Sequence, residues 1–397
     1  RGNIMTPAAR VAAAIEVLED ILGGEPAEKC LTRWARGNRY AGSKDRAAVR
    51  DIIFDVLRRK RTLSALGGSE AARGLLIGYL RGEGIDLEDI FGAGGYGPPA
   101  LSEAEVSAAR PLVSDAETYD FPDWLWPVWQ ADLGVQAIPA AKMLQSRGPV
   151  TLRVNLRRSS QAGAIDVLAE DGIAAVPVGD VNSALQVVEN ERRIKISKAF
   201  SDGLVDLQDL ASQEAVAGLN IPETTRVLDY CAGCGCKALA IADRFKVSVF
   251  AHDISAARMA DIPVRAARAG MNIEVLETDR LKGVAPFDVV FVDAPCSGSG
   301  TWRRAPEAKW ALTSGKLIDY NTLQSKVLKA ASEYAAADST LIYATCSVFA
   351  VENRHVIEAF LAANPSWSLQ RDFQRFPDAD GDGFYHAVLN RVDARCG

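Results

Sequence analysis

Hydrophobic residues in the N-terminal part of the chain recur at the spacing of amphipathic helices. A first helix is expected after Thr6 and Pro7, a pair typical of a helix start, with its end at Gly23-Gly24. A second helix is expected after Ser43, where apolar residues again fall on one face. The pattern therefore predicts a helical domain, which we place, with its linker, at residues 1–140.

After residue 150 the pattern changes to short apolar runs typical of strands. We assign these runs to a small α+β domain at residues 141–212. Just before it, the Trp-rich stretch Trp124–Trp129 suits either packing between domains or an aromatic platform for RNA. Strands are expected at Val150–Val154, Val176-Pro-Val178 and Ala184–Val188, with a helix over 161–170.

From Arg226 onward, apolar strands alternate with helical stretches. Such alternation predicts a mainly parallel, doubly wound α/β sheet with helices on both faces, which we assign to residues 213–397. The strands are expected at Val227–Asp229, Ser248–Ala251, Val289–Val292, Leu341–Tyr343 and Ala387–Leu389.

Composition is that of a globular protein. The 397 residues are 48% hydrophobic and 24% charged, and no apolar run is long enough for a membrane-spanning helix. No secretory signal is expected at the start of the chain, because no apolar stretch follows the first charge. The seven cysteines then indicate a reducing cytoplasm and not a disulfide framework.

The net charge of −6 is unevenly distributed. Residues 1–67 contain 13 basic and 8 acidic residues, a net charge of +5, and aromatic residues lie among the basic ones. This mixture suits an RNA backbone, although a solvated face of a helical domain has the same composition. The candidate RNA contacts in this stretch are Arg33, Arg36, Arg39, Lys44, Arg46 and Arg50.

A glycine-containing turn after the first strand of the C-terminal domain has the features of a nucleotide-binding loop. Gly233 and Gly235 allow a ligand to approach the backbone closely, and the following helix start offers free N–H groups. Asp253, at the end of the next strand, can bind ribose hydroxyls. On these residues alone, NAD and S-adenosylmethionine fit equally well.

Two cysteines follow predicted strands of the same sheet. Cys296 comes three residues after Asp293, and Cys346 follows the strand at Leu341–Tyr343. Because ligands bind beyond the carboxyl ends of parallel strands, both thiols are expected beside the glycine loop. A thiolate that adds to C6 of cytosine makes C5 able to accept a methyl group, whereas an NAD enzyme has no evident use for this arrangement.

These motifs resemble those of the RsmB/Sun family of RNA 5-methylcytosine methyltransferases, over nearly the whole chain. The matching segments are Asp-Ala-Pro-Cys-Ser-Gly at 293–298, Thr-Cys-Ser at 345–347, Gln-Asp-Leu-Ala-Ser at 208–212 and Arg-Val-Asn at 153–155. Residues 1–67 resemble the NusB-like RNA-binding domain of RsmB-type members. The resemblance implies a Rossmann-like class I methyltransferase domain, preceded by an RRM-like α+β domain and an all-α NusB-like domain.

The resemblance also implies roles for the site residues. Cys346 would be the nucleophile on C6, Cys296 would assist product release, and Asp293 would contact the base near N3 close to the methyl donor. Arg304 would help to hold the RNA. S-adenosylmethionine would be held by Cys231, Ala232, Gly233, Cys234, Gly235, Cys236 and Lys237, with Asp253 at the ribose, Asp279 at the adenine amine and Asp293 near the methyl donor.

The glycine loop departs from the family pattern. Members usually have Cys-Ala-Ala-Pro-Gly-Gly-Lys, where this chain has Cys-Ala-Gly-Cys-Gly-Cys-Lys at 231–237. A Cβ at Cys236 would crowd the cofactor if that position needed a positive φ. The three cysteines also raise the question of zinc, but His252 is the one candidate for a fourth ligand, so no metal is expected.

The sequence thus predicts an S-adenosylmethionine-dependent RNA (cytosine-5-)-methyltransferase that acts on ribosomal RNA, as a monomer, in the cytoplasm and without a membrane partner. Two alternatives stay open. One is the same chemistry on transfer RNA. The other is a non-catalytic, RNA-binding ribosome assembly factor whose cofactor loop has decayed.

Overall fold

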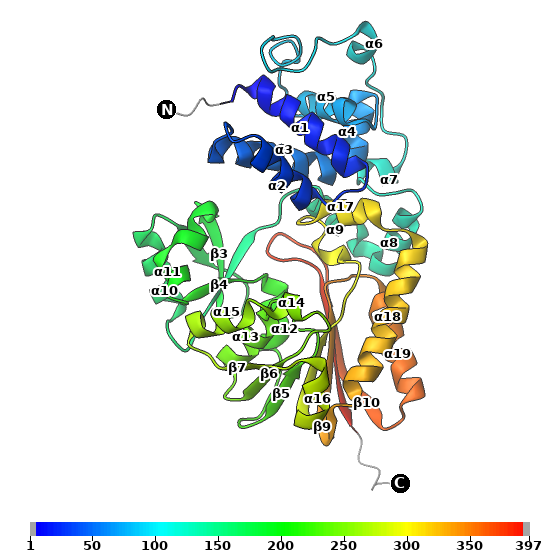
Figure 1. Ribbon diagram of the computed structural model, residues 1–397. Helices are drawn as coiled ribbons and strands as arrows, with labels where there is room; N and C mark the ends of the chain where they lie inside the picture. Colours follow the sequence, from blue (N-terminus) through cyan, green and yellow to red (C-terminus); the bar gives the residue numbers. More distant parts are fainter. Residues whose placement is uncertain (1–4, 392–397) are drawn as a thin grey trace. The chain divides into compact units, whose positions relative to one another are not determined.

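The computed structural model describes residues 5–391, which form two compact units (Figure 1). The helical unit comprises residues 5–147 together with Trp302–Ser314, and the α/β unit comprises Gly148–Thr301 with residues 315–391. Within residues 5–391, no helix is long and apolar enough to cross a membrane. The expectation about a secretory signal concerns the chain start, of which residues 1–4 lie outside the described part.

The helical unit begins as the hydrophobic pattern predicts. Helix α1 (Pro7–Leu22) is capped by Thr6, whose hydroxyl accepts a 3.2 Å hydrogen bond from the Ala9 amide, and it ends at Gly23. The predicted second helix is α3 (Ser43–Arg58). The other helices are α2 (Ala27–Gly37), α4 (Lys60–Gly67), α5 (Ala72–Gly82), α6 (Glu103–Val106), α7 (Asp115–Thr118), α8 (Leu125–Leu133), η1 (Gly134–Gln136), α9 (Ala137–Leu144) and α17 (Pro306–Ala311).

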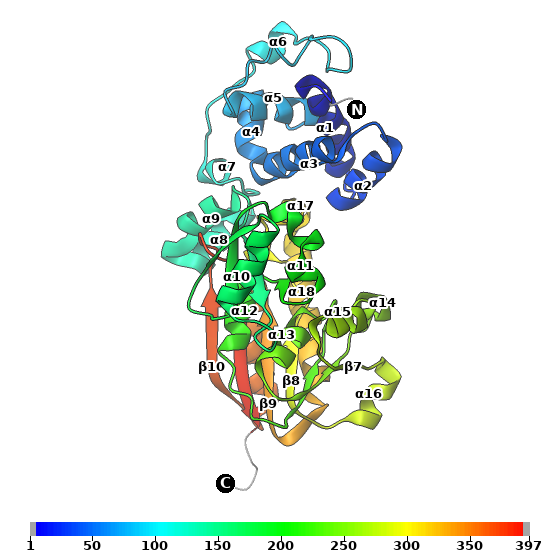
Figure 2. The same cartoon turned by 90° about the vertical axis from the view of Figure 1, so that its left-hand side faces the viewer.

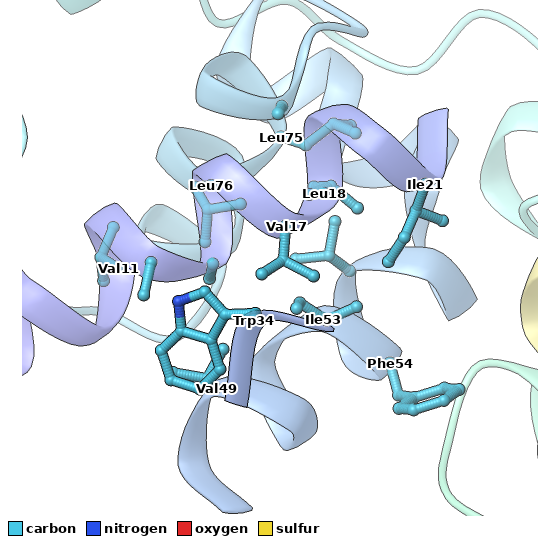
Figure 3. Close-up of a cluster of buried hydrophobic side chains, with 14 of the residues drawn as sticks. Val11, Val17, Leu18, Ile21, Trp34, Val49, Ile53, Phe54, Leu75 and Leu76 are labelled. Atoms are coloured by element: carbon cyan, nitrogen blue, oxygen red, sulfur yellow. The ribbon is translucent and has the colours of Figure 1, made fainter. Parts of the chain in front are cut away.

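One hydrophobic core joins helices α1 to α5. Figure 2 shows helices α1 to α5 packed together. Leu18 of α1, Ile53 of α3 and Leu76 of α5 are fully buried, and Trp34 of α2 lies against one side of the cluster (Figure 3). This core draws on residues from Met5 to Phe91. The basic residues from Arg33 to Arg50 therefore lie on α2 and α3, or in the turn between them, and the apolar faces of both helices are part of this core.

A segment from the C-terminal half of the chain completes the helical unit. The Trp302 ring stacks on Trp129 with 6.2 Å between centroids, and the Trp310 indole donates a 2.7 Å hydrogen bond to the Leu57 carbonyl. Trp126 and Trp129 are buried, and their ring partners Phe121 and Trp302 belong to the same unit, so this stretch packs within the helical unit and not between domains as expected. Nothing in the sequence pattern indicated that Trp302–Ser314 would leave the α/β unit, and the three-domain boundaries stay a prediction.

The first part of the α/β unit is a four-stranded antiparallel sheet with the order β2-β3-β1-β4. Three of its strands and the helix α10 lie where the pattern predicts them, whereas β4 was not predicted. The elements are β1 (Val150–Val154), α10 (Gln161–Glu170), β2 (Ala174–Pro177), β3 (Ala184–Glu189), η2 (Glu191–Ile196), α11 (Lys198–Ser201), β4 (Val205–Leu207) and α12 (Leu210–Ala217).

The second part is a seven-stranded sheet with the order β10-β11-β9-β8-β5-β6-β7. The five strands from β9 to β7 are parallel, and β11 pairs antiparallel with both β9 and β10, which confirms the predicted mainly parallel sheet. Its strands are β5 (Arg226–Asp229), β6 (Ser248–Ala251), β7 (Ile273–Val275), β8 (Phe287–Asp293), β9 (Ala335–Thr345), β10 (Trp367–Arg375) and β11 (Phe384–Arg391). Its helices are α13 (Cys236–Arg244), α14 (Ala256–Met259), α15 (Ile262–Ala269), α16 (Thr278–Val284), η3 (Ser299–Thr301), α18 (Ser314–Ser332), η4 (Ala350–Glu352) and α19 (Arg354–Ala363).

Both faces of this sheet are covered, because alternate residues of each strand enter different cores. Val227 and Val289 pack under α12, α13 and α15, whereas Leu228 and Val290 pack under α18 and α19 (Figure 1). The strand order reverses between β5 and β8. Ligands of open α/β sheets bind beyond the strand ends at such a reversal, so the loops after β5 and β8 are the expected site.

Candidate functional site

The glycine loop joins β5 to α13 and has the backbone form that its glycines predict. Gly233 and Gly235 adopt φ values of 53° and 83°, in the region that favours glycine. A Cβ on Gly235 would lie 2.9 Å from the Ile262 side chain, so no larger residue fits there. Cys236, by contrast, is the first residue of α13 and has no positive φ, which removes the expected clash.

Three carboxylates and a lysine surround this loop. Lys237 Nζ lies 2.8 Å from Asp293 Oδ2, and this ion pair holds the pKa of Lys237 above its usual value against the opposing effect of burial. Asp229 is fully buried, and neither of its oxygens makes a hydrogen bond among the described residues. Burial, together with the charge of Asp293, raises the pKa of Asp229 to about 8.

Asp253 is fixed at the end of β6. Its Oδ2 accepts a 3.0 Å hydrogen bond from the Gly233 amide, and its Oδ1 accepts one of 2.9 Å from the Ser255 amide. The guanidinium of Arg258, which is 62% exposed, lies 3.2 Å from the same carboxylate. Asp279 lies in the first turn of α16 and is exposed.

The two cysteines predicted at strand ends lie together. Cys296 Sγ and Cys346 Sγ are 3.4 Å apart, and the Gly300 amide donates a 2.9 Å hydrogen bond to the Cys346 carbonyl. The hydrogen bond from Cys296 lowers the pKa of the Cys346 thiol, and the Lys237 ammonium adds to this effect. The same hydrogen bond, together with burial, raises the pKa of Cys296. The pKa shifts of the two neighbouring thiols therefore have opposite directions, downward at Cys346 and upward at Cys296.

A buried carboxylate that sequence reasoning missed holds the two cysteine loops together. Glu352 is fully buried and accepts hydrogen bonds from the Ser297 amide at 2.8 Å and from the Ser297 and Ser347 hydroxyls. Gln324 Nε2 donates a fourth, at 3.0 Å. Ser297 and Ser347 each follow one of the cysteines directly. The hydrogen bonds that define this role of Glu352 become visible only in the folded structure.

The other two loop cysteines form a second thiol pair. Cys234 Sγ and Cys236 Sγ are 3.5 Å apart, and the Arg265 guanidinium donates to Cys236 Sγ at 3.4 Å and to the Cys234 carbonyl at 2.6 Å. His252 does not join them, because its Nδ1 lies 2.9 Å from the Tyr230 carbonyl and its Nε2 lies 3.0 Å from the Thr278 hydroxyl. In the described part of the chain, no three His, Cys, Asp or Glu side chains are gathered as metal ligands.

The basic residues singled out in the helical unit fall into two groups. Arg33 is ion-paired with Asp20 and Glu25, and Arg50 is ion-paired with Glu28. The other four candidates, Arg36, Arg39, Lys44 and Arg46, are exposed and have no ion pair to another described residue. The three arginines among them line an open hollow of about 520 Å³. Arg304 is exposed in the segment that precedes α17.

Two family models match the chain from residue 121 onward. The family model for the 16S rRNA methyltransferase RsmB/F matches residues 216–390, and the RsmF/B-like ferredoxin-like domain matches residues 121–193. Ribosomal RNA small subunit methyltransferase B of Sodalis glossinidius is 32% identical over 408 residues, which cover 89% of this chain and 91% of that protein. The protein of the same name from Xylella fastidiosa is 30% identical over 397 residues, with 87% and 90% covered.

Solved structures share the fold at lower identity. The crystal structure of PH0851 has a TM-score of 0.76 at 21% identity and covers 98% of this chain and 99% of that chain. The structure of NSun6 from Pyrococcus horikoshii with SFG has a TM-score of 0.62 at 17% identity and covers 69% of this chain and 99% of that chain.

Proposed function

Because the chain belongs to the RsmB/F family of ribosomal RNA methyltransferases, we propose that it methylates C5 of a cytosine in ribosomal RNA through a covalent adduct on Cys346. The observation that carries this proposal is the 3.4 Å separation of Cys346 Sγ and Cys296 Sγ beside the Lys237–Asp293 ion pair. This arrangement brings a thiol with a lowered pKa, a thiol with a raised pKa and a carboxylate together in one strand-end site.

Cys346 is the nucleophile in this proposal. C5 of cytosine is a poor nucleophile until a thiolate adds to C6, and the pKa of Cys346 is lowered by the hydrogen bond from Cys296. The pKa of Cys296 is raised by the same hydrogen bond and by burial, which suits the later step, in which the adduct is released by elimination. Asp293 contacts the base near N3, and Lys237 offsets negative charge at that edge of the ring.

The loop after β5 fits S-adenosylmethionine. A sulfonium and an ammonium carry positive charge, and the loop presents the buried, unpartnered carboxylate of Asp229 together with Asp253 and Asp293. Residues 231–237 hold the methionine part, Asp253 the ribose and Asp279 the adenine amine. When bound, this cofactor supplies an activated methyl group. The chain's own contribution is to hold it beside Cys346 and to exclude water from the thiolate.

RNA binding is assigned to the exposed, unpaired basic residues of the helical unit. Arg36, Arg39, Lys44 and Arg46 have charges that are not neutralised by described carboxylates, so phosphates can take that place. Arg33 and Arg50 are already ion-paired and contribute less. The target cytosine must be unpaired or flipped to reach Cys346, because the reacting atoms of a stacked base are covered.

The test is methyl transfer to ribosomal RNA from a deletion strain, with labelled S-adenosylmethionine and variants of the two cysteines. Cys346→Ala is expected to abolish transfer. Cys296→Ala is expected to allow transfer but to accumulate an RNA–protein adduct that survives denaturing gel electrophoresis. Full activity of Cys346→Ala would refute the mechanism. Bisulfite sequencing of the product RNA then identifies the modified cytosine.

The same assay tests the alternatives. Label in transfer RNA and not in ribosomal RNA would support the first alternative. Absence of S-adenosylmethionine binding at millimolar concentration in a calorimetric titration would support the second, a non-catalytic assembly factor with a decayed loop.

A further inference from the structure

Cys234 and Cys236 belong to the loop assigned to the cofactor, but their thiols take no chemical step in the proposed methylation, and Cys236 stands where the family usually has glycine. Their sulfur atoms are 3.5 Å apart, so a disulfide of about 2 Å requires a movement of only about 1.5 Å. The residue between them is Gly235, whose positive φ shows that the backbone turns sharply at this point. We propose that Cys234 and Cys236 form a peroxide-reactive dithiol that closes to a disulfide within the cofactor loop.

The two thiols differ in the way that such a reaction needs. Cys234 is exposed, whereas Cys236 is half-buried at the first position of α13. The hydrogen bond from Cys236 lowers the pKa of Cys234 to about 5, and the Arg265 guanidinium adds to this effect. The positive end of the α13 dipole acts in the same direction. Cys234 is thus the attacking thiolate and Cys236 the resolving thiol.

Arg265 is the positioning residue of the pair. It lies 2.7 Å from Asp206 through Nη2, and it donates to Cys236 Sγ and to the Cys234 carbonyl through Nη1. Asp206 lies on β4, so the guanidinium is held from outside the loop. Cys231, the third loop cysteine, is excluded from this chemistry, because burial and nearby carboxylates raise the pKa of its thiol.

The reaction balances with hydrogen peroxide as the oxidant. The Cys234 thiolate attacks one peroxide oxygen, the O–O bond breaks, and a sulfenic acid forms as hydroxide leaves. The hydroxide takes up the proton that the Cys234 thiol released to the solvent when it ionised, and becomes water. Cys236 sulfur then attacks Cys234 sulfur, the S–O bond breaks, and the thiol proton leaves with the hydroxyl as water. The two sulfur atoms lose two electrons in total, and the peroxide is reduced to two molecules of water.

The test uses the full reduced chain, treated with equimolar hydrogen peroxide, alkylated and digested with trypsin. The digest separates the loop peptide, Val227–Lys237, from the peptides of Cys296 and Cys346. The loop peptide is expected to lose two hydrogens and to carry one alkyl group, on Cys231. A loop peptide with three alkylated thiols, or a disulfide that includes Cys231, would overturn the proposal.

Variants separate the two roles. Cys236→Ser is expected to leave a sulfenic acid on Cys234 that dimedone traps, and Cys234→Ser is expected to leave the loop unreactive. Arg265→Gln is expected to slow oxidation about tenfold at pH 7 and to move its pH profile upward, with partial rescue in Arg265→Lys. The buried Cys30 is the internal control and should be alkylated only after denaturation. An unchanged rate and pH profile in Arg265→Gln would refute its positioning role.

A consequence for the cofactor rests on the proposed function. Closing the disulfide moves the segment that holds the Gly233 amide against Asp253, so S-adenosylmethionine is expected to bind at least tenfold more weakly until dithiothreitol restores it. Calorimetric titrations of reduced and oxidised Cys346→Ala protein measure this change. Equal affinities would overturn the consequence. Failure of the reduced protein to bind would refute the proposed function, while the peptide map would still decide on the disulfide.

Discussion

Glu352 gives the sharpest test of how the structure holds its two thiols together. Its carboxylate accepts hydrogen bonds from the Ser297 amide, the Ser297 hydroxyl, the Ser347 hydroxyl and Gln324. Glu352→Gln preserves the size of the side chain, and its amide oxygen can still accept from the Ser297 amide and Gln324. The amide nitrogen, however, replaces the oxygen that faces the two hydroxyls.

The expected cost follows from those two bonds. A hydrogen bond to a charged group contributes about 1.5–3 kcal/mol, so weakening two of them should destabilise the loop by about 3 kcal/mol. Since 1.4 kcal/mol is a factor of ten, local opening should become about 100-fold more frequent. The Ser297 amide, which bonds directly to Glu352, should report this opening.

Hydrogen exchange of the Ser297 amide, together with the alkylation rate of Cys346, measures the effect. The matched control is Glu358→Gln on α19, where the carboxylate is exposed. We expect exchange to accelerate about 100-fold in Glu352→Gln and to stay unchanged in the control. Exchange within twofold of the parent protein would refute the view that Glu352 holds the loops together.

Three further predictions concern charge. Lys237→Met should shift the pH profile of Cys346 alkylation upward by about one unit, because the ammonium that lowers the pKa of the thiol is lost, whereas Lys329→Met should leave it unchanged. For Asp229, burial raises the pKa to about 8 from the ordinary value of 3.8, so its contribution destabilises the fold increasingly as pH rises between these values. Asp229→Asn should therefore gain thermal stability over the parent between pH 5 and pH 8, by at most about 1.4 kcal/mol per pH unit, and a constant difference would contradict this. Replacing Arg36, Arg39 and Arg46 together by glutamine should make RNA binding less dependent on salt, lowering the slope of log K against log salt concentration by about two to three. Replacing the ion-paired Arg33 by glutamine should change this slope less.

Substitution is a better test of RNA binding than removal of residues 1–67. The core of the helical unit includes residues up to Phe91, so a deletion would expose the side chains that remain. Charge substitutions on exposed positions leave this core intact.

Hydrophobic periodicity determined most of the fold, because strands and helices impose spacings that the sequence must satisfy locally. Val150–Val154 and Ser248–Ala251 were predicted at their observed limits. The antiparallel β10 was not predicted, since its exposed face breaks the apolar run that marks a buried strand. The motif chemistry likewise pointed to Cys296 and Cys346, because both follow apolar strands of one sheet.

Three features depended on tertiary structure alone. The 3.4 Å approach of Cys296 to Cys346 and the different pKa shifts of the two thiols require the pairing of β8 with β9. Glu352 acquires its role only because two loops, 50 residues apart, meet over it. The partition of the arginines into paired and unpaired groups depends on where helix surfaces place their carboxylates. Sequence spacing fixes which residues enter each element, whereas ionisation and side-chain contacts depend on neighbours that the chain brings together only when it folds.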